Sequence, residues 1–100
     1  MKIPFECVTE EFKVRGYYDT LNEKKGLVWV DENGYDRGNS FPRNPYDRNL
    51  ENEKFEKWRS FRDAILLNYH VILDTVKKFR NYDRVEINHW YYKLKVNYEA

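Results

Sequence analysis

The sequence predicts an α+β fold in which a small antiparallel sheet packs against one long amphipathic helix. Two observations support this class. The glycines and prolines all lie before residue 46, so the front of the chain is rich in turns and residues 46–100 contain no helix breaker. Apolar residues alternate near both ends of the chain, whereas between residues 55 and 79 they recur at intervals of three and four.

The first expected strand covers residues 2–8. Its apolar residues alternate, which places one set on a single face of the strand: Ile3, Phe5 and Cys7. Pro4 removes one backbone donor from the hydrogen-bond ladder. We therefore expect this strand at the edge of the sheet.

Two further strands are expected in the front of the chain. Residues 12–18 and the short apolar run 27–30 are the candidates, and the polar segment 19–26 would join them as a hairpin. A helix over residues 9–25 is the alternative, because Thr9 could cap it. A glycine and a pair of tyrosines inside that segment disfavour a helix. The sequence leaves this choice open.

A long helix is expected to begin near Asp47 or Asn49, either of which can cap it. One face would carry a continuous apolar stripe: Phe55, Trp58, Phe61 or Arg62, Ile65, Tyr69, Ile72, Val76 and Phe79. Three leucines widen this stripe, so the middle of the helix should be buried on more than one side: Leu66, Leu67 and Leu73. No glycine or proline forces a break, although a break or bend at residues 68–70 stays open.

The last expected element is the longest strand, residues 85–98, after a turn at residues 81–84. The apolar alternation changes face near Trp90, which either a bulge or an environment buried on both sides of the strand would explain. One face would carry Val85, Ile87, His89 and Tyr91, and the other Trp90, Tyr92, Leu94, Val96 and Tyr98.

Composition indicates one domain over residues 1–100. Hydrophobic residues make up 41% of the chain and aromatic residues 18%, which argues against disorder. The formal net charge of +1 excludes a strongly acidic DNA mimic and a strongly basic duplex binder. Cys7 is the single cysteine, so no intramolecular disulfide can form. No long apolar run predicts a membrane span or a signal peptide, and we expect a cytoplasmic protein.

Catalytic and metal-binding patterns are scarce. Cys7, His70 and His89 have no zinc spacing, and no phosphate-binding loop, dinucleotide-binding loop or serine elbow is present. The acidic residues between 31 and 36 could serve a small metal-dependent nuclease, but such residues are common in solvated loops. We therefore expect a protein without metal or cofactor, and not an enzyme.

The junction segment, residues 34–46, is the strongest candidate for a contact site. Its two glycines and two prolines indicate a pre-shaped loop that loses little entropy on binding. Aromatic and arginine side chains are enriched at interface hot spots. The expected partner-binding residues, including two arginines of the following helix, are Tyr35, Arg37, Phe41, Arg43, Tyr46, Arg59 and Arg62.

The same region resembles the ribosome modulation factor family over about residues 34–64. The resemblance rests on three features: Gly34-Tyr35-x-x-Gly38, Asn44-Pro45-Tyr46, and a helix carrying Trp58, Arg59, Arg62 and Ala64. It implies a small helical protein that binds ribosomal RNA and silences ribosomes. The flanking strands have no counterpart in that family, and Phe61 falls one place from the family's second aromatic position.

Two functional hypotheses follow. The first is a phage-type binding protein that inhibits a host or defence protein, or a nucleoprotein, by occupying its surface in the host cytoplasm. It rests on the missing catalytic patterns, on the many Tyr, Trp and Arg residues, and on a Tyr-, Asn-, Lys- and Glu-rich composition common in small phage genes. The alternative is a modulator that binds RNA or the ribosome through residues 34–64.

Overall fold

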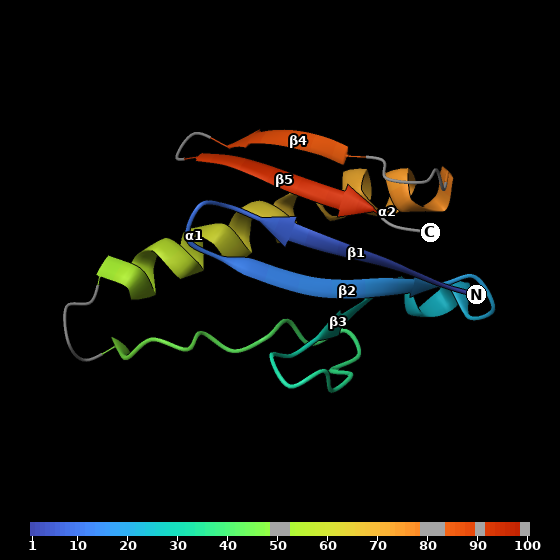
Figure 1. Ribbon diagram of the computed structural model, residues 1–100, viewed down its shortest axis with the longest axis horizontal. Coiled ribbons are helices and arrows are strands. Elements are labelled where there is room, and N and C mark those ends of the chain that lie inside the picture. Colours follow the sequence, from blue (N-terminus) through green and yellow to red (C-terminus); the bar gives the residue numbers. More distant parts are fainter. Residues whose placement is uncertain (49–52, 79–83, 90–91, 99–100) are drawn as a thin grey trace.

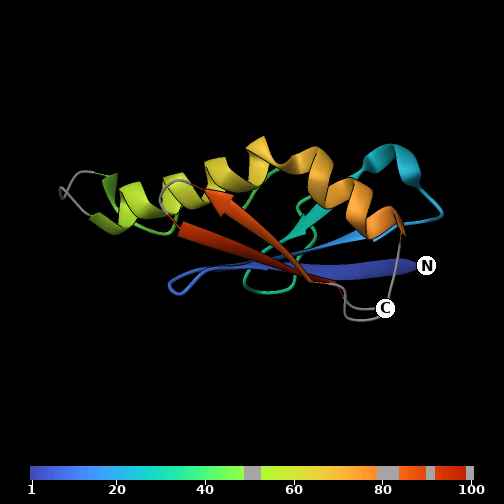
Figure 2. The same cartoon turned by 90° about the horizontal axis from the view of Figure 1, so that it is seen from above.

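The computed structural model describes residues 1–48, 53–78, 84–89 and 92–98. In these residues, five antiparallel strands form one sheet in the order β3-β2-β1-β5-β4, and two helices lie along one face of it (Figures 1 and 2). The α+β class is confirmed. The elements are β1 (Lys2–Val8), β2 (Lys13–Asp19), the 3-10 turn η1 (Glu23–Lys25), β3 (Leu27–Val30), α1 (Glu53–Leu67), α2 (Tyr69–Lys78), β4 (Arg84–His89) and β5 (Tyr92–Tyr98).

Strand β1 forms where predicted but lies in the middle of the sheet, so its expected edge position is wrong. It pairs with β2 along its whole length and with β5 from Phe5 to Val8. Pro4 precedes the part of β1 for which pairing with β5 is described, so its missing N–H falls outside that ladder. The alternating residues of β1 are buried as expected: Ile3, Phe5 and Cys7.

Strands β2 and β3 confirm the hairpin prediction and exclude the competing helix over residues 9–25. They pair antiparallel, with Arg15 opposite Val30 and Tyr18 opposite Leu27. Gly26 enters β3 with a φ of 63°, a left-handed conformation that glycine adopts without steric cost. The hydroxyl of Tyr69 in α2 accepts a hydrogen bond of 2.9 Å from the Leu27 N–H, which ties the start of β3 to the helical layer.

The helical region consists of two helices rather than one, which corrects the expected single long helix. The interruption falls at Asn68, whose backbone N–H bonds to the Ile65 carbonyl at 3.1 Å in a tightened turn. Its side-chain amide donates to the Ala64 carbonyl at 2.7 Å. Because an asparagine side chain can replace a backbone partner, the helix changes course here without glycine or proline. Asp47, one expected start, is not helical.

Most of the predicted stripe is buried against the sheet, whereas the leucines expected to widen it are not all buried. Leu66 and Leu67 are 43% and 79% exposed, so burial of the helical region on more than one side is wrong. The sheet covers only one side of α1 and α2, and the other side faces solvent (Figure 2). The buried stripe residues are Trp58, Phe61, Ile65, Ile72 and Val76. Asn49 and Phe79 lie outside the described residues.

The expected last strand is an antiparallel hairpin, and the prediction of one strand over residues 85–98 is wrong. β4 and β5 pair with His89 opposite Tyr92 and Val85 opposite Val96. The change of apolar face in the sequence therefore reflects a reversal of the chain rather than a bulge in one strand. Trp90 and Tyr91 lie outside the described residues, as do residues 81–83 of the expected turn.

Gly16 leaves room for the core where β2 faces β1 and β3. A Cβ atom at this position would lie 2.6 Å from the Val28 carbonyl oxygen and 2.7 Å from Cζ of Phe5. Such distances require the neighbouring groups to shift. The Phe5 ring itself packs edge-on against Trp29 at 5.5 Å, so it has little freedom to move.

We predict that Gly16→Ala destabilises the protein by about 1–3 kcal/mol, the usual cost of overpacking. Denaturant unfolding followed by tryptophan fluorescence measures this change. The neighbouring exposed substitution Arg15→Ala is the control and should stay within about 0.5 kcal/mol of the wild type. Equal stability of Gly16→Ala and the control would contradict the close packing at this position.

Candidate functional site

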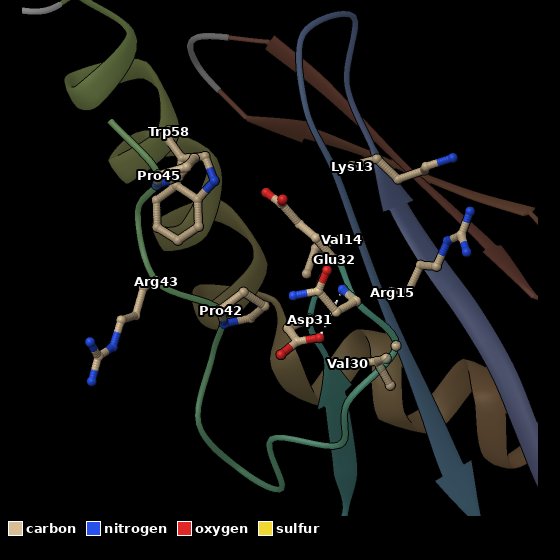
Figure 3. A pocket seen from close by; sticks show the side chains of 12 residues that line it. Lys13, Val14, Arg15, Val30, Asp31, Glu32, Pro42, Arg43, Pro45 and Trp58 are labelled. Carbon is tan, nitrogen blue, oxygen red and sulfur yellow. Dashed lines mark hydrogen bonds between the residues drawn. The ribbon is translucent and has the colours of Figure 1, made fainter. Parts of the chain in front are cut away.

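A rigid turn, residues 31–34, follows β3 directly. The Oδ1 atom of Asp31 accepts hydrogen bonds from the backbone N–H groups of Asn33 and Tyr35, both at 2.9 Å. The Asp31 carbonyl accepts a further bond from Gly34 at 3.0 Å, and Gly34 has a φ of 84°. These bonds hold Asp31 and Glu32 along one wall of a groove (Figure 3).

The segment after this turn, residues 35–38, covers the outer edge of β3. The Trp29 N–H donates to the Gly38 carbonyl at 2.9 Å, and the Arg37 N–H donates to the Trp29 carbonyl at 2.8 Å. Asp36 holds the segment to the open face of the sheet, because its carboxylate accepts a hydrogen bond from the Tyr17 hydroxyl. The edge of β3 is therefore closed by the chain itself.

The carboxylate of Asp36 and the hydroxyl of Tyr17 perturb each other's ionisation. The hydrogen bond to Asp36, followed by desolvation, raises the pKa of Tyr17 above its usual value. The Tyr17 hydroxyl, followed by the Gly38 N–H, lowers the pKa of the Asp36 carboxyl. Both shifts favour the hydrogen-bonded pair of a neutral phenol and an ionised carboxylate.

Phe41, one of the expected partner-binding residues, joins the loop to the core. Its ring lies 4.9 Å from that of Trp29 and 5.5 Å from that of Trp58, edge-on in both cases. Together with Phe5, these rings form an aromatic row from the sheet through the loop to α1. Phe41 is thus held between two tryptophans.

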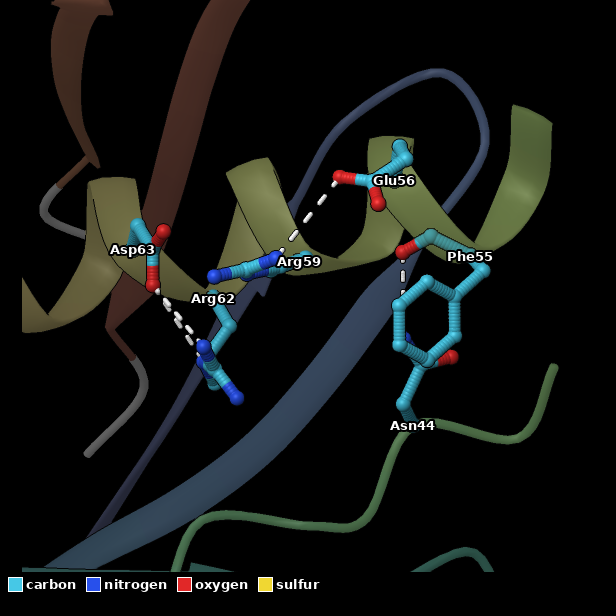
Figure 4. Close-up of polar contacts among 6 residues, drawn as sticks. All are labelled: Asn44, Phe55, Glu56, Arg59, Arg62 and Asp63. Carbon is cyan, nitrogen blue, oxygen red and sulfur yellow. Dashed lines mark hydrogen bonds and ion pairs between the residues drawn. The ribbon is translucent and has the colours of Figure 1, made fainter. Parts of the chain in front are cut away.

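The segment 41–46, here called the strap, is also fixed to α1 by polar contacts. The Asn44 side-chain amide donates to the Phe55 carbonyl at 3.1 Å (Figure 4), and its Oδ1 accepts from the Tyr46 N–H at 3.0 Å. The Tyr46 ring packs against Phe12 at 6.0 Å. The strap is therefore anchored at both ends, by Phe41 and by Tyr46.

A groove with a volume of about 540 Å³ lies between the strap and the start of β2. Trp58 and two prolines of the strap form one wall, and the turn 31–34 with β2 forms the other (Figure 3). The volume falls within the range of about 300–1,000 Å³ typical of ligand sites. The lining residues are Lys13, Val14, Arg15, Val30, Asp31, Glu32, Asn33, Gly34, Pro42, Arg43, Pro45 and Trp58.

The charged residues of this groove have no ionic partners within the described part of the chain. Lys13, Arg15, Arg43 and Glu32 form no ion pair with any residue that the structure describes. The three cations project away from the interior, whereas the Glu32 side chain points into the space opposite Trp58 (Figure 3). Charged side chains of both signs, without ionic partners among the described residues, thus lie around the apolar wall formed by Trp58 and the two prolines.

Three cations of α1 differ from those of the groove, because each lies beside a carboxylate. Arg59 and Arg62, two of the residues expected to bind a partner, lie beside carboxylates on the exposed side of the helix (Figure 4) and do not line the groove. The pairs are Arg59 with Glu56 at 4.0 Å, Arg62 with Asp63 at 3.2 Å, and Lys57 with Glu11 at 3.1 Å.

The remaining expected contact residues are spread around the loop. Arg43 lines the groove, Tyr35 is 70% exposed beyond the turn 31–34, and Arg37 is half-buried at the β3 edge. The sequence prediction missed Lys13 and Arg15, which reach the groove from β2. No local pattern distinguishes them, because only the pairing of β2 with β3 brings them to this wall.

Neither metal nor nucleophile chemistry gains support from the geometry. Within the described residues, no three His, Cys, Asp or Glu side chains are grouped to hold a metal ion. Cys7 is fully buried in the core, and desolvation raises the pKa of its thiol far above the usual range, which disfavours the reactive thiolate. None of the described helices has the length and apolar character needed to cross a bilayer.

Comparison with known proteins gives no match to a protein-family model, a curated protein or a solved structure. The segment Gly34–Gly38, which the ribosome modulation factor resemblance places in a helix, forms a turn and a single bridge between Asp36 and Val30.

We predict that Phe41→Ala destabilises the protein by about 3–4 kcal/mol, near the lower end of the range for buried aromatic truncation because the ring is partly buried. Chemical denaturation measures this loss. Tyr35→Ala, in the same loop but exposed, is the matched control and should leave stability within about 0.5 kcal/mol. If both variants unfold like the wild type, Phe41 is not part of the core.

A second prediction concerns pH. Because the folded-state pKa of Asp36 is depressed, its stabilising contribution is present above the unfolded pKa of about 3.9 and is lost as pH falls through the folded pKa. Asp36→Asn should therefore melt below the wild type near neutral pH, and the difference should shrink in strong acid. Tyr17→Phe should behave in the same way. A difference independent of pH would contradict this account.

Proposed function

We propose that this chain is a non-enzymatic binding protein that acts by occupying the surface of another protein, with the groove at the centre of contact. The observation that supports this most directly is the lining of the groove. The Trp58 ring and two prolines stand beside charged groups of both signs that have no ionic partner among the described residues. Such a mixture is typical of protein interfaces, where charge sets orientation and aromatic contact supplies affinity.

The rigidity of the groove supports the same proposal. Hydrogen bonds to Asp31 fix one wall, and Phe41 and Asn44 fix the other. A site already held in shape loses little conformational entropy when a partner binds. The buried rings of Trp29 and Trp58 hold the strap in place before any contact is made.

A protein partner fits the electrostatics better than an RNA partner. Two carboxylates, Asp31 and Glu32, line the groove and would repel phosphates. Two arginines of α1 that the RNA hypothesis uses, Arg59 and Arg62, lie beside the carboxylates of Glu56 and Asp63, which reduce the positive potential there. For these reasons RNA binding is an outcome of the test below rather than our proposal.

The proposed target is a host or defence protein in the cytoplasm of a phage-infected cell, blocked because its own contact surface is covered. This target class is supported only by the composition of the chain, which is short and rich in Tyr, Asn, Lys and Glu in the manner of small phage genes. The groove supplies the means of contact and does not depend on the identity of the target.

The test is affinity capture from a host lysate, with and without nuclease, using the full chain. Lys13→Glu combined with Arg43→Glu reverses two exposed groove charges, and Lys24→Glu combined with Lys77→Glu makes the same change elsewhere on the exposed surface. We expect the groove variant to bind the captured partner at least about tenfold more weakly, a loss of about 1.4 kcal/mol of binding free energy. The control should retain it.

Two results would contradict the proposal. Equal capture by both variants would place the contact outside the groove. Loss of capture after nuclease treatment, together with a steep decline of binding in salt, would indicate an RNA partner.

A further inference from the structure

We infer that the groove takes an extended protein segment that presents one cationic side chain, arginine or lysine, between Trp58 and Glu32, with acidic residues on either side of it. This inference rests on the proposed function and names the chemistry of the contact. It follows from the different positions of the carboxylates and the cations around the groove.

The interior of the groove suits a long cationic side chain. Trp58, Val14 and Pro45 supply apolar surface for the methylene stem. The buried position of Trp58, which is 7% exposed, leaves only part of this ring available to the groove.

Among the carboxylates that line the groove, that of Glu32 is the one free to bind a cation there. Asp31 already accepts two backbone hydrogen bonds through its Oδ1 atom, which serve the turn 31–34. Glu32, by contrast, forms no ion pair within the described residues and points into the groove opposite Trp58 (Figure 3). An arginine or lysine head group between these two side chains would gain a charge-assisted hydrogen bond.

The side chains at the rim of the groove, in contrast to Glu32, are positively charged. Lys13 and Arg15 project from β2 on one side, and Arg43 projects from the strap on the other, all three away from the interior (Figure 3). A segment lying across the groove would therefore meet cations before and after its central residue. Acidic residues at those places complement the rim, whereas an anionic central residue would face the carboxylates of Glu32 and Asp31.

The test uses the full chain, isotope-labelled, and three short acetylated peptides in a glycine–serine background with a glutamate on each side of the centre. The central residue is arginine, its uncharged isostere citrulline, or glutamate. Binding is followed by the NMR shift of the Trp58 indole N–H, which a Trp58→Phe spectrum assigns. We expect the arginine peptide to bind about two- to fivefold more tightly than the citrulline peptide, the usual gain from one exposed ion pair.

Variants of Glu32 separate charge selection from simple contact. Glu32→Gln should reduce the preference for arginine to near unity, and Glu32→Lys should reverse it in favour of the glutamate peptide. Asp74→Asn, an exposed change on α2, is the control and should keep the wild-type preference. Glu32 is exposed, so these variants should fold, and their dispersed NMR spectra verify this.

The inference is overturned if arginine and citrulline peptides bind equally, if the preference survives Glu32→Gln, or if millimolar arginine peptide leaves the Trp58 signal unmoved. These results would leave the proposed function standing, because the capture experiment tests it separately. If capture of the lysate partner still depends on Lys13 and Arg43, the groove binds a protein but does not select a cation. If capture is also independent of those residues, the proposed function fails as well.

Discussion

The aromatic row formed by Phe5, Trp29, Phe41 and Trp58 is the interaction on which the rest of the structure depends. It links the central strand β1, the short strand β3, the strap and helix α1 through three edge-on contacts between 4.9 and 5.5 Å. The helices cover only one face of the sheet (Figure 2), so much of the attachment between layers falls to these large rings.

The groove is a consequence of this row. Phe41 holds the start of the strap in place, so that Pro42 and Pro45 lie along one wall of the groove. An edge of Trp58 remains exposed to the groove between the two walls. Asp31 independently fixes the opposite wall through backbone hydrogen bonds. The charged side chains around the groove are thus presented by two rigid supports, which is the condition for a contact surface that binds without rearrangement.

Local sequence patterns predicted the elements better than their arrangement. Alternation predicted β1, a short apolar run predicted β3, and the stripe from Trp58 to Val76 predicted the buried side of the helices, because these patterns depend on neighbouring residues. The central position of β1 despite Pro4, and the hairpin of β4 and β5, depend on pairing between distant segments, which short-range patterns do not encode. The site was predicted in part: Arg43 comes from the expected loop, whereas Arg15 comes to the groove through the pairing of β2 with β3.

The position of Phe41 makes the junction segment part of the core and, at the same time, a wall of the groove. The most direct measurement is a nuclear Overhauser spectrum of the full chain with assigned aromatic side chains. The account predicts cross peaks from the Phe41 ring protons to the indole protons of both Trp29 and Trp58. A Phe41 ring with solvent-like chemical shifts and no cross peak to either indole would contradict it.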